Sequence, residues 1–333
     1  MTNANAAIVV ITGASAGIGR ATAVAFGRRG WRVALLARDV ERLESAASAV
    51  RAAGGEAIAI ATDVADHSQV EAAAQRVERE WGPIEVWINN AMAAIFSTFM
   101  ETPPEDFRRA TEVTYLGAVW GTLAALKRMK PRDRGTIIQI GSALAYRSIP
   151  LQSPYCGAKS ALRGFTDSVR SELIHDASRV KLTMVHLSAF NTPQFDWGRN
   201  RMGKLAQPVG RIFQPELAAE AIYSAALKPQ REVWVGFPAV QAIIGTRLIP
   251  GILDWWLARK AYDGQQARRT LPADYRDNLY RPVPGHRDAH GRFDAHARAF
   301  SLQHWLNTRR FAAAAITLAA ALAMGAWLGN RKR

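Results

Sequence analysis

The residues with the clearest capacity for chemistry are Tyr155 and Lys159, four positions apart near the start of a helix-length segment. On an α-helix this spacing places both side chains on one face. An ammonium group beside a phenol stabilises the phenolate, and so lowers the pKa of the phenol from its usual value of about 10. The pair predicts a tyrosine that exchanges a proton near neutral pH, although helix surfaces also produce this spacing by chance.

A glycine-rich segment near the amino terminus is suited to holding a phosphate-bearing cofactor. The apolar run 6–11 is followed by Thr12-Gly13-Ala14-Ser15-Ala16-Gly17-Ile18-Gly19, and residues 20–29 are expected to form a helix. Glycines let the backbone approach a diphosphate, and a helix N-terminus offers free N–H groups and a positive dipole end. The order of strand, turn and helix predicts a nucleotide site, with an ordinary tight turn as the alternative.

Strand and helix patterns alternate along the first 236 residues. Strands are predicted at 6–11, 32–37, 57–61, 84–88, 136–140, 181–187 and 232–235, and helices at 20–29, 40–53, 68–81, 105–130, from 153 onward and at 215–227. This alternation predicts a doubly wound α/β Rossmann fold with a seven-stranded parallel sheet flanked by helices. Ligands bind at the carboxyl ends of such strands. Residues 188–214 are expected to form a mobile lid over that edge.

With these motifs in place, residues 6–236 resemble the short-chain dehydrogenase/reductase family. The resemblance implies a cofactor site formed by Thr12, Gly13, Ser15, Gly17, Ile18, Gly19, Asp63, Val64, Asn89 and Thr192, in which Asp63 contacts adenine and Thr192 holds the nicotinamide carboxamide. Ser142 would bind the substrate oxygen and Tyr155 would give or take the proton, while Lys159 would lower the tyrosine pKa and hold the ribose. The implied reaction is hydride transfer between a nicotinamide cofactor and a carbonyl/alcohol pair.

The choice between the two nicotinamide cofactors depends on the end of the second strand. Relatives that bind NAD place an acidic residue there, whereas this chain has Arg38 followed by Asp39. A guanidinium pairs well with a 2′-phosphate, so NADP is predicted. The alternative is a surface arginine with Asp39 as a helix N-cap, which would leave NAD as the cofactor.

Two positions depart from the family pattern. Met92 replaces the glycine that commonly follows Asn89-Asn90-Ala91, and Thr114 replaces the asparagine of the long helix that takes part in a proton relay. Thr114 keeps a hydroxyl and is the fourth catalytic candidate, although threonine can instead bond to backbone. Asn90 and Cys156 are expected to be structural.

Composition restricts the compartment and the partners. The net charge is +15, and residues 231–333 carry 16 Lys and Arg against 7 Asp and Glu, which suits an anionic membrane; no nucleic-acid motif accompanies it. The single cysteine excludes an internal disulfide framework and a cysteine-built metal site and is compatible with a reducing compartment. His286 and His290 are expected to be solvated, so no metal is predicted. No signal peptide is recognised at Met1–Ala7.

The carboxy-terminal third is divided into three segments. Residues 237–260 are apolar and carry Trp255 and Trp256, and they either cover the substrate cleft or lie at a membrane interface. Residues 261–310 are polar and basic and are expected to be an extended linker. Residues 311–329 are an uncharged run of 19, about 28 Å long as a helix, which predicts a transmembrane or membrane-embedded anchor, with a helix packed on the enzyme as the alternative.

The sequence therefore predicts a membrane-associated, NADP-dependent oxidoreductase acting on a lipophilic ketone, aldehyde or alcohol, with its catalytic domain in the cytoplasm. A catalytically inactive nucleotide-binding scaffold and an epimerase or dehydratase of the same fold remain the alternatives. The family resemblance further implies a homodimer or homotetramer formed through the long helix and the helix that carries Tyr155.

Overall fold

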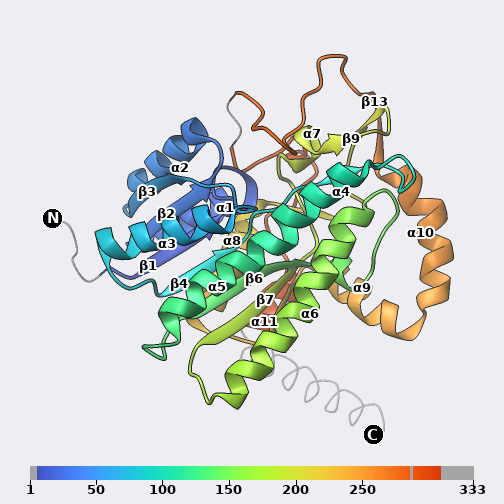
Figure 1. Ribbon diagram of the computed structural model, residues 1–333. Coiled ribbons are helices and arrows are strands. Elements are labelled where there is room, and N and C mark those ends of the chain that lie inside the picture. Colours follow the sequence, from blue (N-terminus) through green and yellow to red (C-terminus); the bar gives the residue numbers. More distant parts are fainter. Residues whose placement is uncertain (1–5, 286–287, 309–333) are drawn as a thin grey trace, which may run out of the picture.

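A computed structural model of the protein describes residues 6–285 and 288–308, with a parallel sheet at its centre (Figure 1). The strands of this sheet are β1 (Ile8–Thr12), β2 (Arg32–Ala37), β3 (Glu56–Ala61), β4 (Val86–Asn89), β6 (Thr136–Ser142), β7 (Lys181–Leu187) and β12 (Glu232–Val235). Their spatial order is β12-β7-β6-β4-β1-β2-β3. The order reverses at β1, which pairs with both β2 and β4. The Rossmann fold and the seven-stranded sheet are thus confirmed, and the reversal is where such folds bind ligands.

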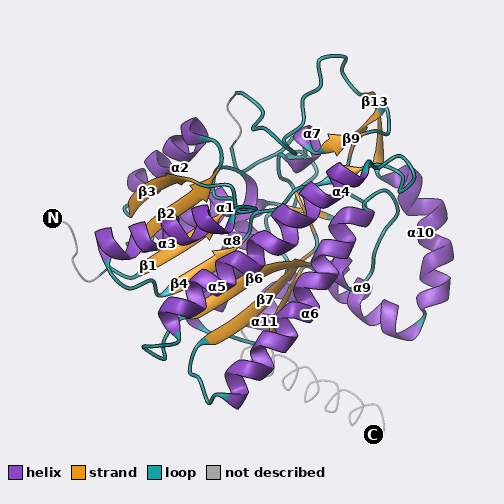
Figure 2. Cartoon of the chain, viewed as in Figure 1, coloured by secondary structure: helices purple, strands orange, loops and turns teal. Residues whose placement is uncertain are grey.

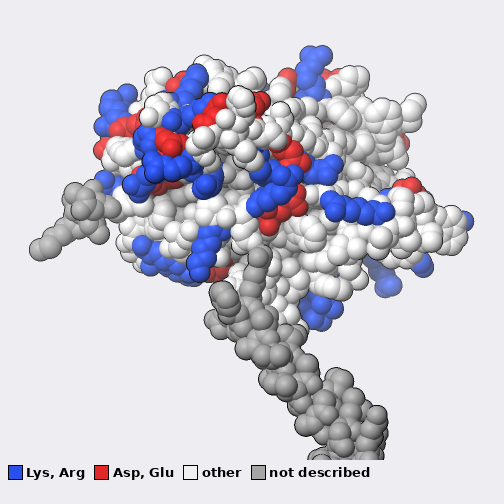
Figure 3. All heavy atoms as spheres, turned by 90° about the horizontal axis from the view of Figure 1, so that it is seen from below, with Lys and Arg blue, Asp and Glu red and all other residues white. Residues whose placement is uncertain are grey.

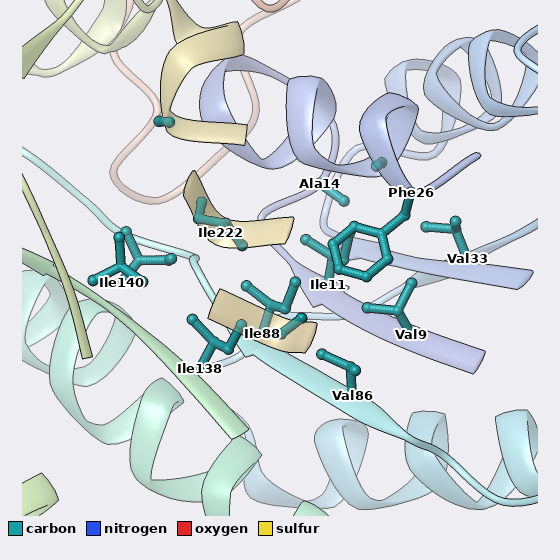
Figure 4. Close-up of a cluster of buried hydrophobic side chains, with 14 of the residues drawn as sticks. Val9, Ile11, Ala14, Phe26, Val33, Val86, Ile88, Ile138, Ile140 and Ile222 are labelled. Atoms are coloured by element: carbon teal, nitrogen blue, oxygen red, sulfur yellow. The ribbon is translucent and has the colours of Figure 1, made fainter. Parts of the chain in front are cut away.

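Helices cover both faces of the sheet (Figure 2). One face is covered by α1 (Gly17–Gly27), α2 (Val40–Ala52) and α8 (Pro215–Leu227), and the other by α3 (His67–Trp81), α5 (Gly117–Met129) and α6 (Ser153–His175). Side chains alternate along β1, so Val9 and Ile11 pack toward α1 and α8 while Val10 packs toward the opposite layer. Figure 4 shows Phe26 of α1 over Val9 and Ile11. Buried apolar side chains fill the space between the sheet and the helices on both faces. This packing holds the carboxyl ends of the strands, where ligands bind in such folds, in fixed positions.

The long helix predicted at 105–130 is divided in three. α4 (Pro104–Thr111) leads into a π-helical turn, η1 (Glu112–Leu116), before α5 begins. Isolated π-turns inside helices occur frequently at functional sites. Here the turn contains Thr114, whose hydroxyl bonds to the backbone of Ala93 rather than to its own helix.

The segment predicted to be a mobile lid is instead paired with its surroundings. It contains β8 (Ala189–Phe190), α7 (Gln194–Trp197), β9 (Arg199–Asn200), β10 (Lys204–Ala206) and β11 (Ile212–Phe213). β8 pairs with β11, and β9 pairs with β5 (Ile95–Phe96). These backbone bonds, together with buried Phe195 and Phe213, hold the segment in place.

The prediction that residues 261–310 form an extended linker is also wrong for residues 261–285 and 288–308, which the structure describes. After α9 (Phe237–Leu248) and α10 (Pro250–Gly264), β13 (Gln266–Thr270) pairs with β10, and α11 (Leu302–Thr308) lies beside β12. Gln303 of α11 donates to the carbonyl oxygen of Trp234 and accepts from the N–H of Gly236. Polar side chains of the kind that suggested a linker, such as Gln303, therefore form hydrogen bonds with backbone groups far away in the sequence.

No helix within residues 6–285 and 288–308 is long and apolar enough to cross a membrane. The anchor predicted at 311–329 lies outside the described residues. α9 and α10, predicted only as an interrupted apolar stretch, are two helices that meet at Ile249-Pro250.

Candidate active site

A groove of about 960 Å³, open to solvent, follows the carboxyl ends of β1, β2 and β4. Among the residues that line it are Gly13, Ser15, Gly17, Ile18, Arg38, Asp63, Val64, Asn90, Met92, Thr192 and Gln194. Eight of the predicted cofactor residues, from Gly13 to Thr192 and including Arg38, thus line one groove. Gly13 and Gly17 have φ angles of +65° and +57°, which favour glycine. A Cβ on Gly19 would lie 2.2 Å from the Gly13 carbonyl oxygen, so the turn closes only with glycine there.

The groove fits a dinucleotide on the evidence of its own residues. No side chain caps the N-terminus of α1. The Gly17 N–H donates to the Asp288 carbonyl oxygen at 3.2 Å, and the next N–H groups lack intrahelical partners. These donors and the dipole of α1 favour a diphosphate beside Ser15 and Ile18. Thr12, also predicted to bind the cofactor, lies beneath the groove: its hydroxyl accepts from the N–H groups of Asn90 and Ala91 and ties β1 to β4.

Of the two asparagines at the end of β4, Asn89 departs from its expected role and Asn90 does not. Asn89, predicted to lie beside the cofactor, is 3% exposed, accepts a bond from the Trp87 indole and donates to Thr122 and Gln139. Asn90, predicted to be structural, donates to the Thr12 and Gly13 carbonyl oxygens and so braces the end of β4 against the end of β1. It also lines the groove. The side chain of β4's last residue points inward, so the next residue faces the groove.

Three arginines stand at the end of the groove formed by β2 and β3. Arg42 pairs with Asp39 at 2.7 Å, and Arg109 pairs with Asp63, the residue predicted to contact adenine. Asp39 caps α2 by accepting from the Arg42 N–H, which is the role that the alternative interpretation of this position gave it. Arg38 donates instead to the backbone carbonyls of residues 278–280. Burial lowers the pKa of Arg38, and Asp63 opposes that shift. Arg42 and Arg109 were not predicted, because their approach depends on the fold.

The catalytic candidates gather at the carboxyl end of β6, one strand beyond β4. Ser142 ends β6, and its hydroxyl accepts from the Leu144 N–H at 3.1 Å in η2 (Ala143–Ala145). Tyr155 lies on the first turns of α6, near enough to Ser142 for the serine side chain to act on the pKa of the phenol. Lys159 is 2% exposed, lies 5.7 Å from the centre of the Tyr155 ring, and donates to the Ile140 carbonyl oxygen at 2.6 Å. The structure therefore brings Ser142, Tyr155 and Lys159 together.

The electrostatics of this cluster differ from the prediction. Burial raises the pKa of Tyr155 to about 12, a shift that the nearby Ser142 side chain opposes. Burial also lowers the pKa of Lys159 to about 8. The expected depression of the tyrosine pKa by the ammonium is absent here, because the Lys159 ammonium is directed at a β6 carbonyl. At neutral pH Tyr155 is a neutral phenol, which is the form that donates a proton.

Thr114 does not reach this cluster with a free hydroxyl. Its oxygen accepts from the Ala93 N–H at 3.0 Å and donates to the Ala93 carbonyl oxygen at 3.3 Å, and the side chain is 1% exposed. Both functions of the hydroxyl are thus used in holding the chain after β4. The relay predicted for Thr114 is not supported by this geometry.

A buried polar network behind Ser142 was not anticipated. His186 of β7 makes a bond of 3.2 Å to the Ser142 carbonyl oxygen, and its other ring nitrogen lies 3.8 Å from Glu232. Burial alone raises the pKa of Glu232, but the neighbouring His186 imidazole and the hydrogen bonds from Tyr146 and Trp234 lower it to about 2. The network braces the end of β6 from β7 and β12. No local pattern signals it, since bonded members such as Tyr146 and Glu232 are 86 residues apart.

No cluster of three or more histidine, cysteine or acidic side chains that could hold a metal ion occurs in the part of the chain that the structure describes. His290 is bonded to Asp294 and Glu216 rather than solvated, and His286 lies outside the described residues. Cys156 is buried beside Tyr155.

Comparisons with known proteins agree with the geometry. A family model for short chain dehydrogenases matches residues 7–200. The uncharacterized oxidoreductase YxnA of Bacillus subtilis is 33% identical over 266 residues, covering 79% of this chain and 74% of that protein. The probable oxidoreductase EphD of Mycobacterium tuberculosis is 33% identical over 261 residues, but the match covers 74% of this chain and only 44% of EphD.

Solved structures show the same likeness. The crystal structure of a metagenomic short-chain oxidoreductase in complex with NADP superposes with a TM-score of 0.59 at 27% identity, covering 69% of this chain and 96% of that one.

Proposed function

The chain belongs to the short-chain dehydrogenase/reductase family, and from this premise we propose that it is an NADP-dependent oxidoreductase that interconverts a lipophilic ketone or aldehyde and its alcohol. The observation that carries the proposal is the cluster of Ser142, Tyr155 and Lys159 beside the glycine-lined groove. When bound, the nicotinamide supplies or accepts the hydride.

The side chains of the cluster divide the remaining work. The Ser142 hydroxyl, held by β6 and η2, orients the substrate oxygen. The Tyr155 hydroxyl transfers the proton to or from that oxygen, and its neutral state suits the direction of carbonyl reduction. Lys159, buried against β6, supplies an ammonium group next to the reacting centre. Met92 and Gln194 in the groove lining are positioned to contact the ligands.

The proposed cofactor preference rests on Arg38. Its guanidinium lines the groove at the end of β2, where the ribose of a bound dinucleotide lies in Rossmann folds. Among the ion pairs of residues 6–285 and 288–308, none includes Arg38, so its charge is available to an anion. The complex of the metagenomic relative with NADP supports the same choice.

A screen for NADPH oxidation tests the proposed activity. Purified full-length protein is mixed with NADPH and a panel of aldehydes and ketones of increasing hydrophobic surface, and absorbance at the nicotinamide band is followed. We expect turnover on the more hydrophobic members, with NADH at least about tenfold less effective because it lacks the phosphate that Arg38 would bind. Turnover on none of them, with NADPH still binding, would favour the inactive scaffold.

We also propose that α9 and α10 dock the enzyme on an anionic lipid surface. Seven of their apolar side chains are exposed: Phe237, Ile244, Leu248, Ile249, Ile252, Trp255 and Trp256. Exposed Arg247, Arg259 and Lys260 border them, and Arg259 stacks on Trp255 at 3.8 Å. In Figure 3 the right-hand side, where these helices lie, is largely uncharged with basic side chains at its border. Tryptophans and cations beside an apolar face suit a membrane interface.

This surface also lies close to the substrate side of the site. α9 packs on η2, directly after Ser142, and Gln265 at the end of α10 bonds to Gln152 and to the Pro150 carbonyl oxygen before α6. A lipophilic substrate leaving the bilayer would therefore meet the catalytic strand end. The oligomer predicted through the long helix and α6 stays a prediction.

Sedimentation with lipid vesicles tests the docking surface. Full-length protein is mixed with vesicles of phosphatidylcholine alone or with phosphatidylglycerol, at two salt concentrations. We expect the double variant Trp255→Ala/Trp256→Ala to bind anionic vesicles about tenfold more weakly than the wild type, because two large apolar side chains no longer enter the interface. Leu227→Ala removes an exposed apolar side chain from α8 and serves as the control. Equal binding of the double variant and the wild type would refute this surface.

A further inference from the structure

Residues 278–283, here named the strap, lie across the end of the groove at which Arg38 stands. In Figure 1 this segment is the orange chain that approaches α2. Asn278 and Pro282 belong to the groove lining. The strap comes from the part of the chain beyond the family match, yet it completes one wall of the cofactor groove.

Three arginines of the catalytic domain hold the strap by its backbone carbonyl oxygens. Arg42 donates to Val283, and Arg109 donates to Leu279 at 3.3 Å. Arg38 donates to the carbonyls of all three residues from Asn278 to Tyr280, at 3.1 Å to Leu279 and 3.0 Å to Tyr280. The strap thus contacts each cation that faces this end of the groove.

Arg38 differs from the other two in its charge balance. Arg42 and Arg109 each form an ion pair with an aspartate, whereas the partners of Arg38 are carbonyl dipoles. A guanidinium has five N–H donors, and the strap carbonyls engage three of them. Arg38 therefore combines a fixed orientation and two remaining donors with a charge that forms no ion pair within the described residues and is offset only in part by the nearby Asp63.

Two contacts outside the groove determine the position of the strap. The Leu279 side chain is fully buried in the apolar layer that contains α3 and α5. The Tyr280 hydroxyl donates to Asp106 of α4 at 3.0 Å. These two anchors determine where the carbonyls stand, and the carbonyls determine where the guanidinium points.

We propose that the strap is a specificity element that holds the Arg38 guanidinium in the orientation that binds a 2′-phosphate on adenosine. This inference rests on the proposed use of NADP and adds that residues beyond the family match help to determine the preference. Immobilising one long side chain on binding costs about 0.5–1.5 kcal/mol, and the strap removes that cost in advance. It acts by positioning and makes no contact with the reacting atoms.

Calorimetric titration with two nicotinamide-free probes tests the inference. Adenosine 2′,5′-bisphosphate carries the 2′-phosphate and 5′-AMP lacks it. We expect Leu279→Ala and Tyr280→Phe to raise the Kd for the bisphosphate about three- to tenfold and to leave the Kd for 5′-AMP unchanged. In an Arg38→Ala background the same substitutions should have no further effect. Leu257→Ala, which truncates a buried leucine of α10, is the control for general destabilisation.

The outcomes separate this inference from the cofactor assignment. If the wild type prefers the bisphosphate but the strap variants weaken both probes equally, or act equally without Arg38, the strap is merely structural and the inference is overturned. If the wild type binds both probes equally, the NADP assignment fails, and the inference fails with it. Tyr280→Phe removes one hydroxyl only, so it keeps the test decisive should Leu279→Ala not fold.

Discussion

Replacing Tyr155 by phenylalanine is expected to lower kcat about 10²- to 10⁴-fold while leaving the Kd for NADPH within about twofold of the wild type. The substitution removes the phenol hydroxyl that lies beside Ser142 and is placed to exchange the substrate proton. The ring remains, so the packing of α6 on β6 is kept. Steady-state turnover on the best substrate and fluorescence titration with NADPH measure the two quantities.

Tyr223→Phe is the matched control for this variant. Tyr223 packs against Phe26 at a ring distance of 5.0 Å and lies under Arg29, on the opposite face of the sheet from α6. Loss of its hydroxyl should leave both kcat and the Kd unchanged. Wild-type turnover by the Tyr155→Phe protein would show that another group moves the proton, and the assignment of the catalytic cluster would have to be abandoned.

The sequence predicts correctly those parts of the fold that depend on the residues of one short segment. The β-branched run of β1, the apolar runs of β2 and β7 and the glycines after β1 favour their observed backbone conformations locally, so the sheet and the groove are predictable. The ends of the elements are predicted less accurately. β4 begins two residues later than predicted, at Val86, and ends one residue later, at Asn89. The strand thus extends one residue further than predicted, and Asn89 is its last residue. Because side chains alternate between the two faces, Asn89 points inward and Asn90 lines the groove.

The parts that were missed depend on contacts between distant segments. The carbonyl oxygens of residues 278–283 satisfy arginines more than 150 residues away, which no window of polar sequence reveals. Thr114 was a candidate for the relay because it aligns with a family position, but its hydroxyl is used by Ala93. The pKa of Tyr155 depends on burial and on the direction of Lys159, neither of which follows from a spacing of four.

The second large effect is expected for Lys159→Met, which should lose most activity and gain stability at neutral pH. The ammonium is buried, and its pKa is lowered from 10.5 to about 8. Below pH 8 it is charged in both the folded and the unfolded chain, so the full cost of burial is present, about 3 kcal/mol. Methionine avoids that cost. It also loses the hydrogen bond to the Ile140 carbonyl oxygen, and this loss reduces the gain in stability by about 1 kcal/mol. The free energy of unfolding at pH 7 should therefore rise by about 2 kcal/mol.

The pH dependence distinguishes this cause from better packing. Between pH 8 and 10.5 the unfolded wild type binds a proton that the folded protein does not, so the contribution of Lys159 makes the wild type more stable as the pH rises. The advantage of the methionine variant should shrink over the same interval, which urea denaturation at several pH values measures. A constant difference across that range would mean that the folded protein holds Lys159 with an ordinary pKa. The ammonium would then carry no cost of burial, and a gain from the methionine would have to come from apolar contacts alone.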